Sequence, residues 1–583
     1  MALEVREPLE QSQGHDRYEY RTLNQARKEI RLVLVQPASK SPMGDVSCSV
    51  KEVSLGDDAP KYETISYVWG DASRRGKIFI EGLTLDVPGS AEEVMRQMRH
   101  QDQPRTLWID AVCINQSDVS EKTEQVSLMA DIYSKSLCNL VWLGKQEANT
   151  CDLSAAFGSL LADARIQTND FETFYEITRD FSEQGLEATV DYDSILAFYE
   201  CTWFRRLWVI QEAALSPSST CFYLCGDETG HRQIPLLKVL RAAVWLTHHI
   251  AHLPEKLVAS IGLQNAAEMW LFVDVERGPY SRDASYHPHL KKYLTTFRDF
   301  EASEVRDHVN GLLGLYNHYS RTGKCALRPD YTRAPGPIFR DATRACIDED
   351  MGLDVLGMIN APEEDSEGYP SWVPRWDRIW DRDLDIYPML EVYSCNGSKT
   401  YRSLPFDPND ADILPVLGMP FQSVKSVISS PFARDTSTKE QLDFCASSEQ
   451  ALADFDHQPE DIERMLATTL VWGSDHKGQW IHPYAAVRKF RAWKKYLSEH
   501  HDWPRANSDH KTEQDTTVMD ITKPGDIVAV LWGSTQPVTL RPLQRDGEFK
   551  FLGLCYVDGI MDGEALDVDD EGHVEGEQVF RLR

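Results

Sequence analysis

Three short segments within the first 215 residues constrain this chain more than any other feature. Each is an apolar run that ends in acidic, amide or glycine residues: YETISYVWGD (Tyr62 to Asp71), LWIDAVCINQ (Leu107 to Gln116) and WFRRLWVIQEAAL (Trp203 to Leu215). In an open α/β sheet, ligands bind in the crevice beyond the carboxyl ends of the strands. Polar residues that directly follow buried strands therefore gather at one edge, and this pattern predicts a site there.

The predicted binding residues follow the first two runs. Residues 64 to 69 are rich in β-branched and aromatic side chains and stop at Gly70, as expected for a strand that ends in a turn. We expect the site to contain the polar and aromatic residues at these run ends, namely Trp69, Gly70, Asp71, Asp110, Asn115 and Gln116. The alternative for each Asp and Asn is a turn former or a helix cap, a role that these side chains commonly fill.

A helix and another strand are predicted after the second run. Asp118, with Glu121 three residues later, predicts a capping box. The apolar face of this helix is expected at helical spacing, on Val126, Met129, Ala130 and Tyr133. Cys138 to Gly144 is typical of a buried strand that ends at glycine. A strand, a capped helix and a strand in this order predict parallel pairing and an α/β first domain.

The length and the composition of the chain limit the classes of protein to which it can belong. A chain of 583 residues predicts two or three domains, and 42% hydrophobic residues exclude a disordered chain. The formal net charge of −31 argues against nucleic acid and against anionic membrane surfaces. No run approaches eighteen apolar residues, so no membrane span is expected.

The positions of the cysteine and histidine residues indicate the cellular compartment of the protein and whether it has a metal site. Twelve cysteines are scattered singly, and the first sixteen residues lack the pattern of a secretory signal, which predicts a reducing, cytoplasmic location. His248, His249 and His252 lie at the end of a predicted helix, but no acidic ligand or HExxH pattern accompanies them. Imidazoles at a helix C-terminus are favoured by the helix dipole. We therefore predict no metal site and no bound cofactor.

The predicted fold class is a parallel-sheet α/β domain followed by a larger mixed α+β region that ends in a β-rich segment. We expect four parts: a mobile tail over residues 1–20, the first domain over 21–225 with a helical insertion at 146–200, a helical or mixed region over 226–425, and a β-rich region with polar loops over 426–583. Glu29 to Val35 is expected to be an opening or edge strand. Gly525 to Gly533 is expected to pair with Phe549 to Val557, and residues 430–465 and 498–520 to be surface loops.

These segments resemble the HET domain of fungal heterokaryon-incompatibility proteins. Tyr62 to Asp71 looks like the opening motif of that domain, Trp108 to Gln116 like its middle motif, and Arg206 to Glu212 like its closing motif. The resemblance covers about Tyr62 to Leu215. It implies an intracellular protein that acts in non-self recognition and programmed cell death, with a protein partner in recognition and with self-association. Residues 307–315, 370–377 and 525–564 resemble the C-terminal regions of the same proteins without indicating a chemistry.

The HET domain is also a proposed distant relative of Toll/interleukin-receptor (TIR) domains, many of which cleave NAD. Ile65 to Asp71 resembles the first strand and loop of TIR domains, and Trp208 to Glu212 has the Trp-x-x-x-Glu spacing of the segment that holds their catalytic glutamate. The resemblance implies that Glu212 is catalytic and that NAD is a substrate. The length of this chain and its insertion at 146–200 depart from TIR domains.

Cleavage of the nicotinamide–ribose bond passes through an oxocarbenium-like species, which one carboxylate can stabilise. Glu212 would be that carboxylate, Asp71 or Asp110 would contact ribose hydroxyls, and Trp69 would stack on a ring.

Three readings stay open: a cell-death effector with this activity, a non-catalytic oligomerising interaction module, and a small-molecule enzyme that uses the same crevice. The structural alternative for Glu212 is an ion pair with Arg205 or Arg206.

Overall fold

The computed structural model divides into two compact units. The first comprises Met1–Pro288 and Tyr293–Arg333, and the second comprises His289–Lys292 and Ala334–Arg583. The residues that the structure describes are 17–40, 44–56, 59–71, 73–146, 191–225, 231–248, 253–273, 288–320, 327–359, 367–378, 393–397, 399–405, 410–425, 427, 438–453, 458–470, 483–499, 522–557, 560–567, 569 and 573–583. Most of the expected tail and insertion, residues 1–16 and 147–190, lie outside them.

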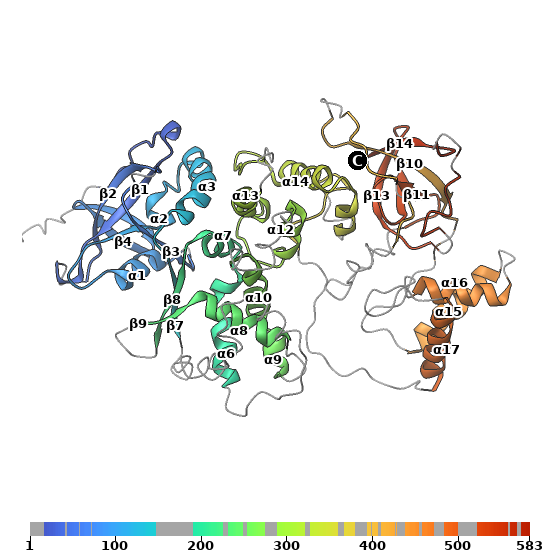
Figure 1. Cartoon of the computed structure of the whole chain (residues 1–583), viewed down its shortest axis with the longest axis horizontal. Helices are drawn as coiled ribbons and strands as arrows, with labels where there is room; N and C mark the ends of the chain where they lie inside the picture. Colours follow the sequence, from blue (N-terminus) through green and yellow to red (C-terminus); the bar gives the residue numbers. More distant parts are fainter. Residues whose placement is uncertain are drawn as a thin grey trace, which may run out of the picture. The chain divides into compact units, whose positions relative to one another are not determined.

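The first unit is built on a mixed sheet, which has nine strands among the described residues (Figure 1). In sheet order these are β5 (Leu83–Pro88), β4 (Arg75–Ile80), β2 (Ser47–Ser54), β1 (Glu29–Val35), β6 (Arg105–Trp108), β3 (Glu63–Tyr67), β7 (Asn139–Gln146), β8 (Ser219–Cys225) and β9 (His231–Pro235). β3 runs parallel to both β6 and β7, and β7 runs parallel to β8. The predicted α/β domain with a parallel centre is confirmed.

The helices of this unit are α1 (Gly89–Met98), α2 (Asp110–Cys113), α3 (Val119–Ser134), α6 (Tyr192–Tyr199), α7 (Trp208–Leu215), α8 (Leu236–His248), α9 (Glu255–Val258), α10 (Ile261–Val273) and α13 (Asp307–Tyr319). α12 (Leu290–Thr296) has residues in both units. α7 packs against α3, α10 and α13. α8, α10 and α13 therefore belong to the same compact unit as the sheet.

The structure changes two local predictions, one about the position of the first strand in the sheet and one about the capping box of α3. β1 opens the sheet in chain order, but it pairs antiparallel with β2 on one side and with β6 on the other, so it is not an edge strand. Asp118 caps α3 as predicted, accepting hydrogen bonds from the backbone N–H groups of Ser120 and Glu121. The Glu121 carboxylate does not complete a capping box. It binds the fully buried Arg31 instead, with Oε1 2.6 Å from Nη1, because that guanidinium needs a counter-charge.

The second unit contains a closed five-stranded barrel among its described residues, drawn toward the red end of the colour bar in Figure 1. Its strands are β10 (Leu414–Ser423), β11 (Ile527–Leu531), β12 (Val538–Pro542), β13 (Glu548–Leu554) and β14 (Gln578–Leu582), and its helices are α14 (Pro335–Asp350), α15 (Thr438–Ala453), α16 (Pro459–Leu470) and α17 (Pro483–Glu499). The predicted β-rich end is confirmed.

Two sequence predictions in this unit are wrong. β11 pairs with β10 and β12, not with the strand at 549–557, because β12 lies between them. β12 is short and lies between Pro537 and a proline at its own end, which hides it as a strand. Residues 430–465 are not only loops, since α15 and α16 occupy most of them. These helices are polar because they share with α17 only a small core, formed by Cys445, Ile462, Leu466, Ala467, Ala486 and Phe490.

Candidate functional site

The candidate site begins at the carboxyl end of β3, which pairs parallel with β6 and with β7. Ser66 and Tyr67, its last two residues, are buried. The indole N–H of Trp203 donates a 2.8 Å hydrogen bond to Ser66 Oγ. The chain then leaves the sheet and turns at Gly70, whose φ of +68° lies in the region that glycine adopts without strain.

Asp110 follows β6 and is the first residue of α2. Its Oδ2 accepts a 2.9 Å hydrogen bond from the indole N–H of Trp69, and its Oδ1 accepts one of 2.7 Å from the backbone N–H of Ala111. Burial raises the pKa of the Asp110 carboxyl, while nearby Arg206 and the Trp69 hydrogen bond act in the opposite direction. The structure therefore brings together two of the predicted residues, Trp69 and Asp110.

Glu212 lies in α7, and only 4% of it is exposed. Its Oε2 has no hydrogen-bond partner among the described residues. Burial raises the pKa of Glu212 to about 7; Arg206 and a hydrogen bond with Ser66 oppose this rise, and the charge of Asp110 adds to it. A carboxyl group with this pKa changes protonation near neutral pH, as groups that take part in proton transfer or charge stabilisation do.

Arg206 connects these groups. Its Nη1 donates a hydrogen bond to the backbone carbonyl of Tyr67, and its charge acts on both Asp110 and Glu212. Arg205, the other arginine considered for Glu212, forms ion pairs with Glu200 at 2.7 Å and with Glu301 at 3.7 Å. Of the two predicted alternatives, the electrostatic partner of Glu212 is therefore Arg206.

Two tyrosines complete the cluster. Burial, reinforced by Asp110, raises the pKa of Tyr67 well above its ordinary value. Burial, reinforced by Glu212 and Asp110, does the same for Tyr133, whose hydroxyl donates a 3.3 Å hydrogen bond to the carbonyl of Ile65. Both phenols are therefore neutral, and of the two hydroxyls only that of Tyr133 donates a hydrogen bond to the described residues. We define the site cluster as Ser66, Tyr67, Asp110, Tyr133, Arg206 and Glu212.

The remaining predicted residues lie in turns. Asp71 is exposed and accepts hydrogen bonds from the backbone N–H of Ser73 at 2.8 Å and from its hydroxyl at 2.7 Å, which lower the pKa of Asp71. Asn115 Oδ1 accepts a 2.7 Å hydrogen bond from the Ser117 hydroxyl. Gln116 is exposed, and its Nε2 donates to the carbonyl of Asp110 at 3.0 Å. These are the hydrogen bonds of turn residues, and a role in substrate binding stays a prediction for Gly70 and for these three.

Sequence reasoning did not assign roles to Ser66, Tyr67 or Tyr133. Ser66 and Tyr67 were visible inside the first motif, where a serine within a strand of β-branched and aromatic residues is a signal of a buried polar contact. Tyr133 was predicted only as part of the apolar face of α3. Its hydroxyl reaches the site because α3 packs against α7, a contact that no local pattern encodes.

A second buried network also contacts α7. The indole N–H of Trp208 donates a 2.8 Å hydrogen bond to Asp307 Oδ2, and the Tyr331 hydroxyl donates one of 2.6 Å to Asp307 Oδ1. A Cβ atom on Gly314 would lie 2.1 Å from Gln211 Oε1, so glycine allows α13 to approach α7 closely. Asp307, Gly314 and Tyr331 therefore help to position the helix that carries Glu212.

In the part of the chain that the structure describes, no group of three or more His, Cys, Asp or Glu residues is arranged to hold a metal ion. The side chains of His248, His249 and His252 lie outside that part. Among the described residues, no helix has both the length and the apolar character needed to cross a bilayer.

The site cluster and the sheet define an α/β domain with a buried acidic centre at the edge of its parallel strands. Residues 62–212 match the family described as "Heterokaryon incompatibility protein (HET)", and residues 436–573 match the "Het-6 beta-barrel domain". The chain therefore contains one region that matches the HET family and another that matches the Het-6 barrel family.

A curated relative supports this assignment. The chain is 26% identical over 430 residues to "Heterokaryon incompatibility protein 6, OR allele" of Neurospora crassa. The match covers 64% of this chain and 62% of the relative, which is less than two thirds of its length. No solved structure matches the chain.

Proposed function

We propose that this protein acts in heterokaryon incompatibility, where its HET domain triggers programmed cell death after the rest of the chain senses a non-self partner. The HET match and the Neurospora relative, which is named as a heterokaryon incompatibility protein, support this role. The match to the relative extends over 430 residues, well beyond the HET domain. Both the effector domain and the regions that follow it therefore enter the proposal.

The observation that carries an enzymatic form of this role is the buried carboxyl of Glu212 beside Asp110 and Arg206, with a pKa raised to about 7. In this form the domain cleaves the nicotinamide–ribose bond of NAD. Nicotinamide leaves with the bonding electron pair, the Glu212 carboxylate stabilises the oxocarbenium-like ribose, and water adds to the ribose carbon and releases a proton. Asp110 and Asp71 would contact ribose hydroxyls, and Trp69 would stack on a ring.

Access to Glu212 requires a rearrangement. With 4% of the residue exposed, the carboxyl is not within reach of a substrate in the described arrangement. α7 is held by α3, α10 and α13, and the hydrogen bond between Trp208 and Asp307 fixes its first residue. The proposal therefore includes an activation step in which these contacts loosen after partner recognition.

The same burial favours a second candidate, a non-catalytic module that kills by assembly. In this reading the Glu212 carboxyl and the Arg206 guanidinium stabilise the fold, and the domain acts through self-association. The interaction of Arg206 with Glu212 is the specific observation that favours it. The small-molecule enzyme using the same crevice has no comparable observation in its favour.

Expression of the full chain in a heterologous host separates the two candidates. NAD content and viability are followed for the parent and for Glu212→Gln, which keeps the shape of the side chain and removes its charge. The matched control is Glu124→Gln, because Glu124 is exposed on α3. Loss of NAD in the parent and the control, but not in Glu212→Gln, supports the enzyme. Killing by all three chains with unchanged NAD rejects the enzyme and supports assembly.

The proposal also includes the cellular location of the protein and the boundaries of its HET domain. We propose a cytoplasmic protein, because the cysteines that the structure describes are free thiols, as expected in a reducing compartment. We also keep residues 21–225 as the proposed extent of the HET domain, with the later parts of the chain as its recognition regions. Fractionation and size-exclusion chromatography test the location and the self-association.

A further inference from the structure

α13 and the residues that precede it lie against α7, the helix that carries Glu212 (Figure 1). We call residues 301–319 the clamp segment. They lie outside residues 62–212, which match the HET family, but inside the same compact unit. From its start to its end, the clamp segment contacts residues from 205 to 214 in the order of the chain, so it runs parallel to α7.

The first contact is made by the backbone of Glu301. Its N–H donates a 2.6 Å hydrogen bond to the carbonyl of Arg205, and its carbonyl accepts one of 3.0 Å from the N–H of Leu207. These two bonds hold the backbone of Arg206, which lies between them. The Arg206 guanidinium donates to the carbonyl of Tyr67 in the site cluster. The clamp segment therefore fixes a residue whose side chain belongs to the site.

One face of α13 makes the next contacts. Asp307, Gly311 and Gly314 are spaced at i, i+4 and i+7, so they share one side of the helix. Asp307 accepts the hydrogen bond from the Trp208 indole, and Gly314 lies opposite Gln211. Two of the three residues on this face are glycines, which bring no side chain to the contact with α7.

The last contact lies at the end of α7, where the Tyr319 hydroxyl donates a 3.2 Å hydrogen bond to the Ala214 carbonyl. Hydrogen bonds are replaced by bonds to water when an interface opens, so their net contribution is modest, whereas buried apolar area is the main stabilisation of a core. α10, which also packs on α7, packs in addition on α6 and α8. Of these two helices, we therefore expect α13 to separate from α7 first.

Both ends of the region that contains the clamp segment connect to α14. The chain passes from the second unit to the first after Lys292, within α12, and returns after Arg333, two residues before α14 begins. At the start of α12, the backbone N–H of Leu290 donates a 2.7 Å hydrogen bond to Glu349, near the end of α14. Residues 293–333 are therefore attached to α14 on both sides.

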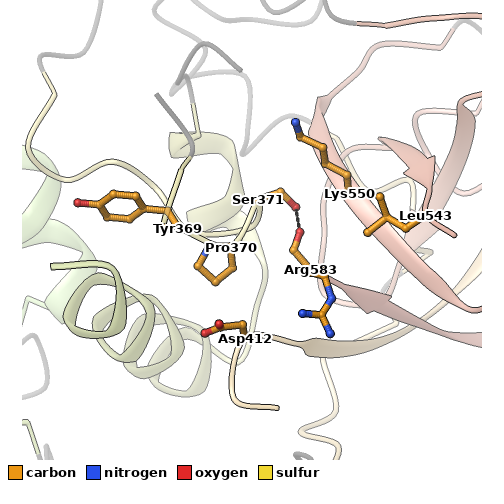
Figure 2. Close-up of a pocket in the computed structure, with 8 residues that line it drawn as sticks. Tyr369, Pro370, Ser371, Asp412, Leu543, Lys550 and Arg583 are labelled. Carbon is orange, nitrogen blue, oxygen red and sulfur yellow. Dashed lines mark hydrogen bonds between the residues drawn. The ribbon is translucent and has the colours of Figure 1, made fainter. Parts of the chain in front are cut away.

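α14 is in turn fixed to the segment that leads into the barrel. Arg340 Nη1 donates a 2.7 Å hydrogen bond to Asp412 Oδ1, and Arg344 Nη2 donates one of 3.1 Å to the carbonyl of Ile413, just before β10. Figure 2 shows Asp412 and Ser371 in the lining of a cavity of about 400 Å³ at this junction. A displacement of the barrel would therefore act on α14, and through α14 on both ends of residues 293–333.

We propose that the clamp segment is an autoinhibitory element that keeps Glu212 closed to substrate, and that the second unit releases it through α14. This inference rests on the proposed function, because it names the regulation of the site at Glu212. Release leaves α7 attached to the sheet, since Asn139 Nδ2, in β7, donates a 3.3 Å hydrogen bond to the Glu212 carbonyl. The site can therefore open while its strands and helix stay in place.

The test uses the purified full chain and two readouts, hydrogen exchange of peptides covering α7 and carbodiimide labelling of the Glu212 carboxyl. Trp208→Phe combined with Tyr319→Phe removes two donors of the interface and keeps the aromatic bulk. This loosened variant is expected to exchange about tenfold faster in α7 and to label faster at Glu212. The matched control is Tyr199→Phe, which removes a 2.7 Å hydrogen bond to the Val239 carbonyl outside the clamp segment and should change neither readout.

The attachment to α14 has its own variant. Glu349→Ala removes the acceptor at the start of α12 and should speed exchange in α13 about threefold. Glu367→Ala, at an exposed residue of the same unit, is its control. Unchanged exchange in α13 of Glu349→Ala would overturn the release through α14.

Thermal unfolding of each chain separates local opening from a general loss of stability, and Tyr319→Phe alone repeats the comparison with a milder change. Unchanged exchange in α7 and unchanged labelling of Glu212 in the folded loosened variant would overturn the clamp. The same increase in Tyr199→Phe would overturn it as well. NAD content of the expression host tests the proposed function separately: faster labelling with unchanged NAD supports the clamp and rejects NAD cleavage.

Discussion

The indole N–H of Trp69 donates a 2.9 Å hydrogen bond to Asp110 Oδ2, which ties the loop after β3 to the first residue of α2. The other oxygen of the same carboxylate accepts from the backbone N–H of Ala111. One side chain thus fixes two segments that are 41 residues apart in the chain. Each segment belongs to a different one of the three sequence motifs, so this hydrogen bond joins two of the motifs in the folded domain.

Trp69→Phe should therefore destabilise the first unit locally. The substitution removes the donor to a partly buried carboxylate, which typically costs about 1–2 kcal/mol. Asp110→Ala should cost more, since both Trp69 and Ala111 then lose their acceptor. Hydrogen exchange of peptides covering β3 and α2 measures the change. Val119→Ala, at a side chain on α3 that is 53% exposed, is the control and should leave the exchange unchanged.

Glu212 should make stability depend on pH. Its pKa in the folded chain is raised to about 7 from an ordinary value of 4.5. Its contribution is therefore most favourable below pH 4.5 and is lost as pH rises through 7, a change of about 3 kcal/mol for such a shift. Glu212→Gln does not titrate, so its stability relative to the parent should increase between pH 4.5 and pH 7.5. Thermal unfolding at several pH values measures this, and a difference independent of pH would contradict the raised pKa.

Two glycines of α13 should respond oppositely to alanine. A Cβ on Gly311 would make only ordinary contacts, at 3.4 Å or more, with Leu207 and Trp208. Gly311→Ala should therefore stabilise the helix by about 0.5–1 kcal/mol, the usual gain in helix propensity. Gly314→Ala forces the buried Gln211 to move and should cost about 1–3 kcal/mol.

A double variant checks this explanation. Gln211→Ala removes the atom that clashes, so Gly314→Ala should cost much less in that background than in the parent. Equal costs in the two backgrounds would show that the approach of α13 to α7 does not depend on this contact. Chemical denaturation followed by hydrogen exchange in α7 gives both values.

The two acidic residues at the start of α3 should differ in importance. Asp118→Ala removes a helix cap and should cost about 1 kcal/mol. Glu121→Gln leaves the fully buried guanidinium of Arg31 without its counter-charge and should cost about 3 kcal/mol or more. Parallel unfolding curves of the two variants decide this, and equal losses would mean that Glu121 serves mainly as part of a cap.

Much of the fold could be predicted where a pattern is local. The β-branched and aromatic content of residues 64–69, the cap at Asp118 and the helical spacing of α3 correspond to observed elements. β12 was missed because a short strand next to proline has no such signature. α15 and α16 were missed because their polar surfaces dominate their composition, while their shared core is small.

Some residues of the candidate site could be predicted from the sequence, and others could not. Trp69 and Asp110 were predicted at one edge and do meet, because the carboxyl ends of parallel strands converge. The positions of Tyr133 and Arg206 beside Glu212 could not be predicted. They depend on how α3 and the segment before α7 pack on the sheet.

By itself, the sequence determined the α/β class, the strand that ends at Tyr67 and the cap of α3 at Asp118, because these depend on residues close together in the chain. Only the tertiary structure decided that Glu212 is buried beside Arg206 and that Asp307 holds Trp208 from nearly a hundred residues away. The pKa of a carboxyl group depends on its desolvation and on the charges around it. Both are set by packing between elements that are distant in sequence, so no local pattern contains them.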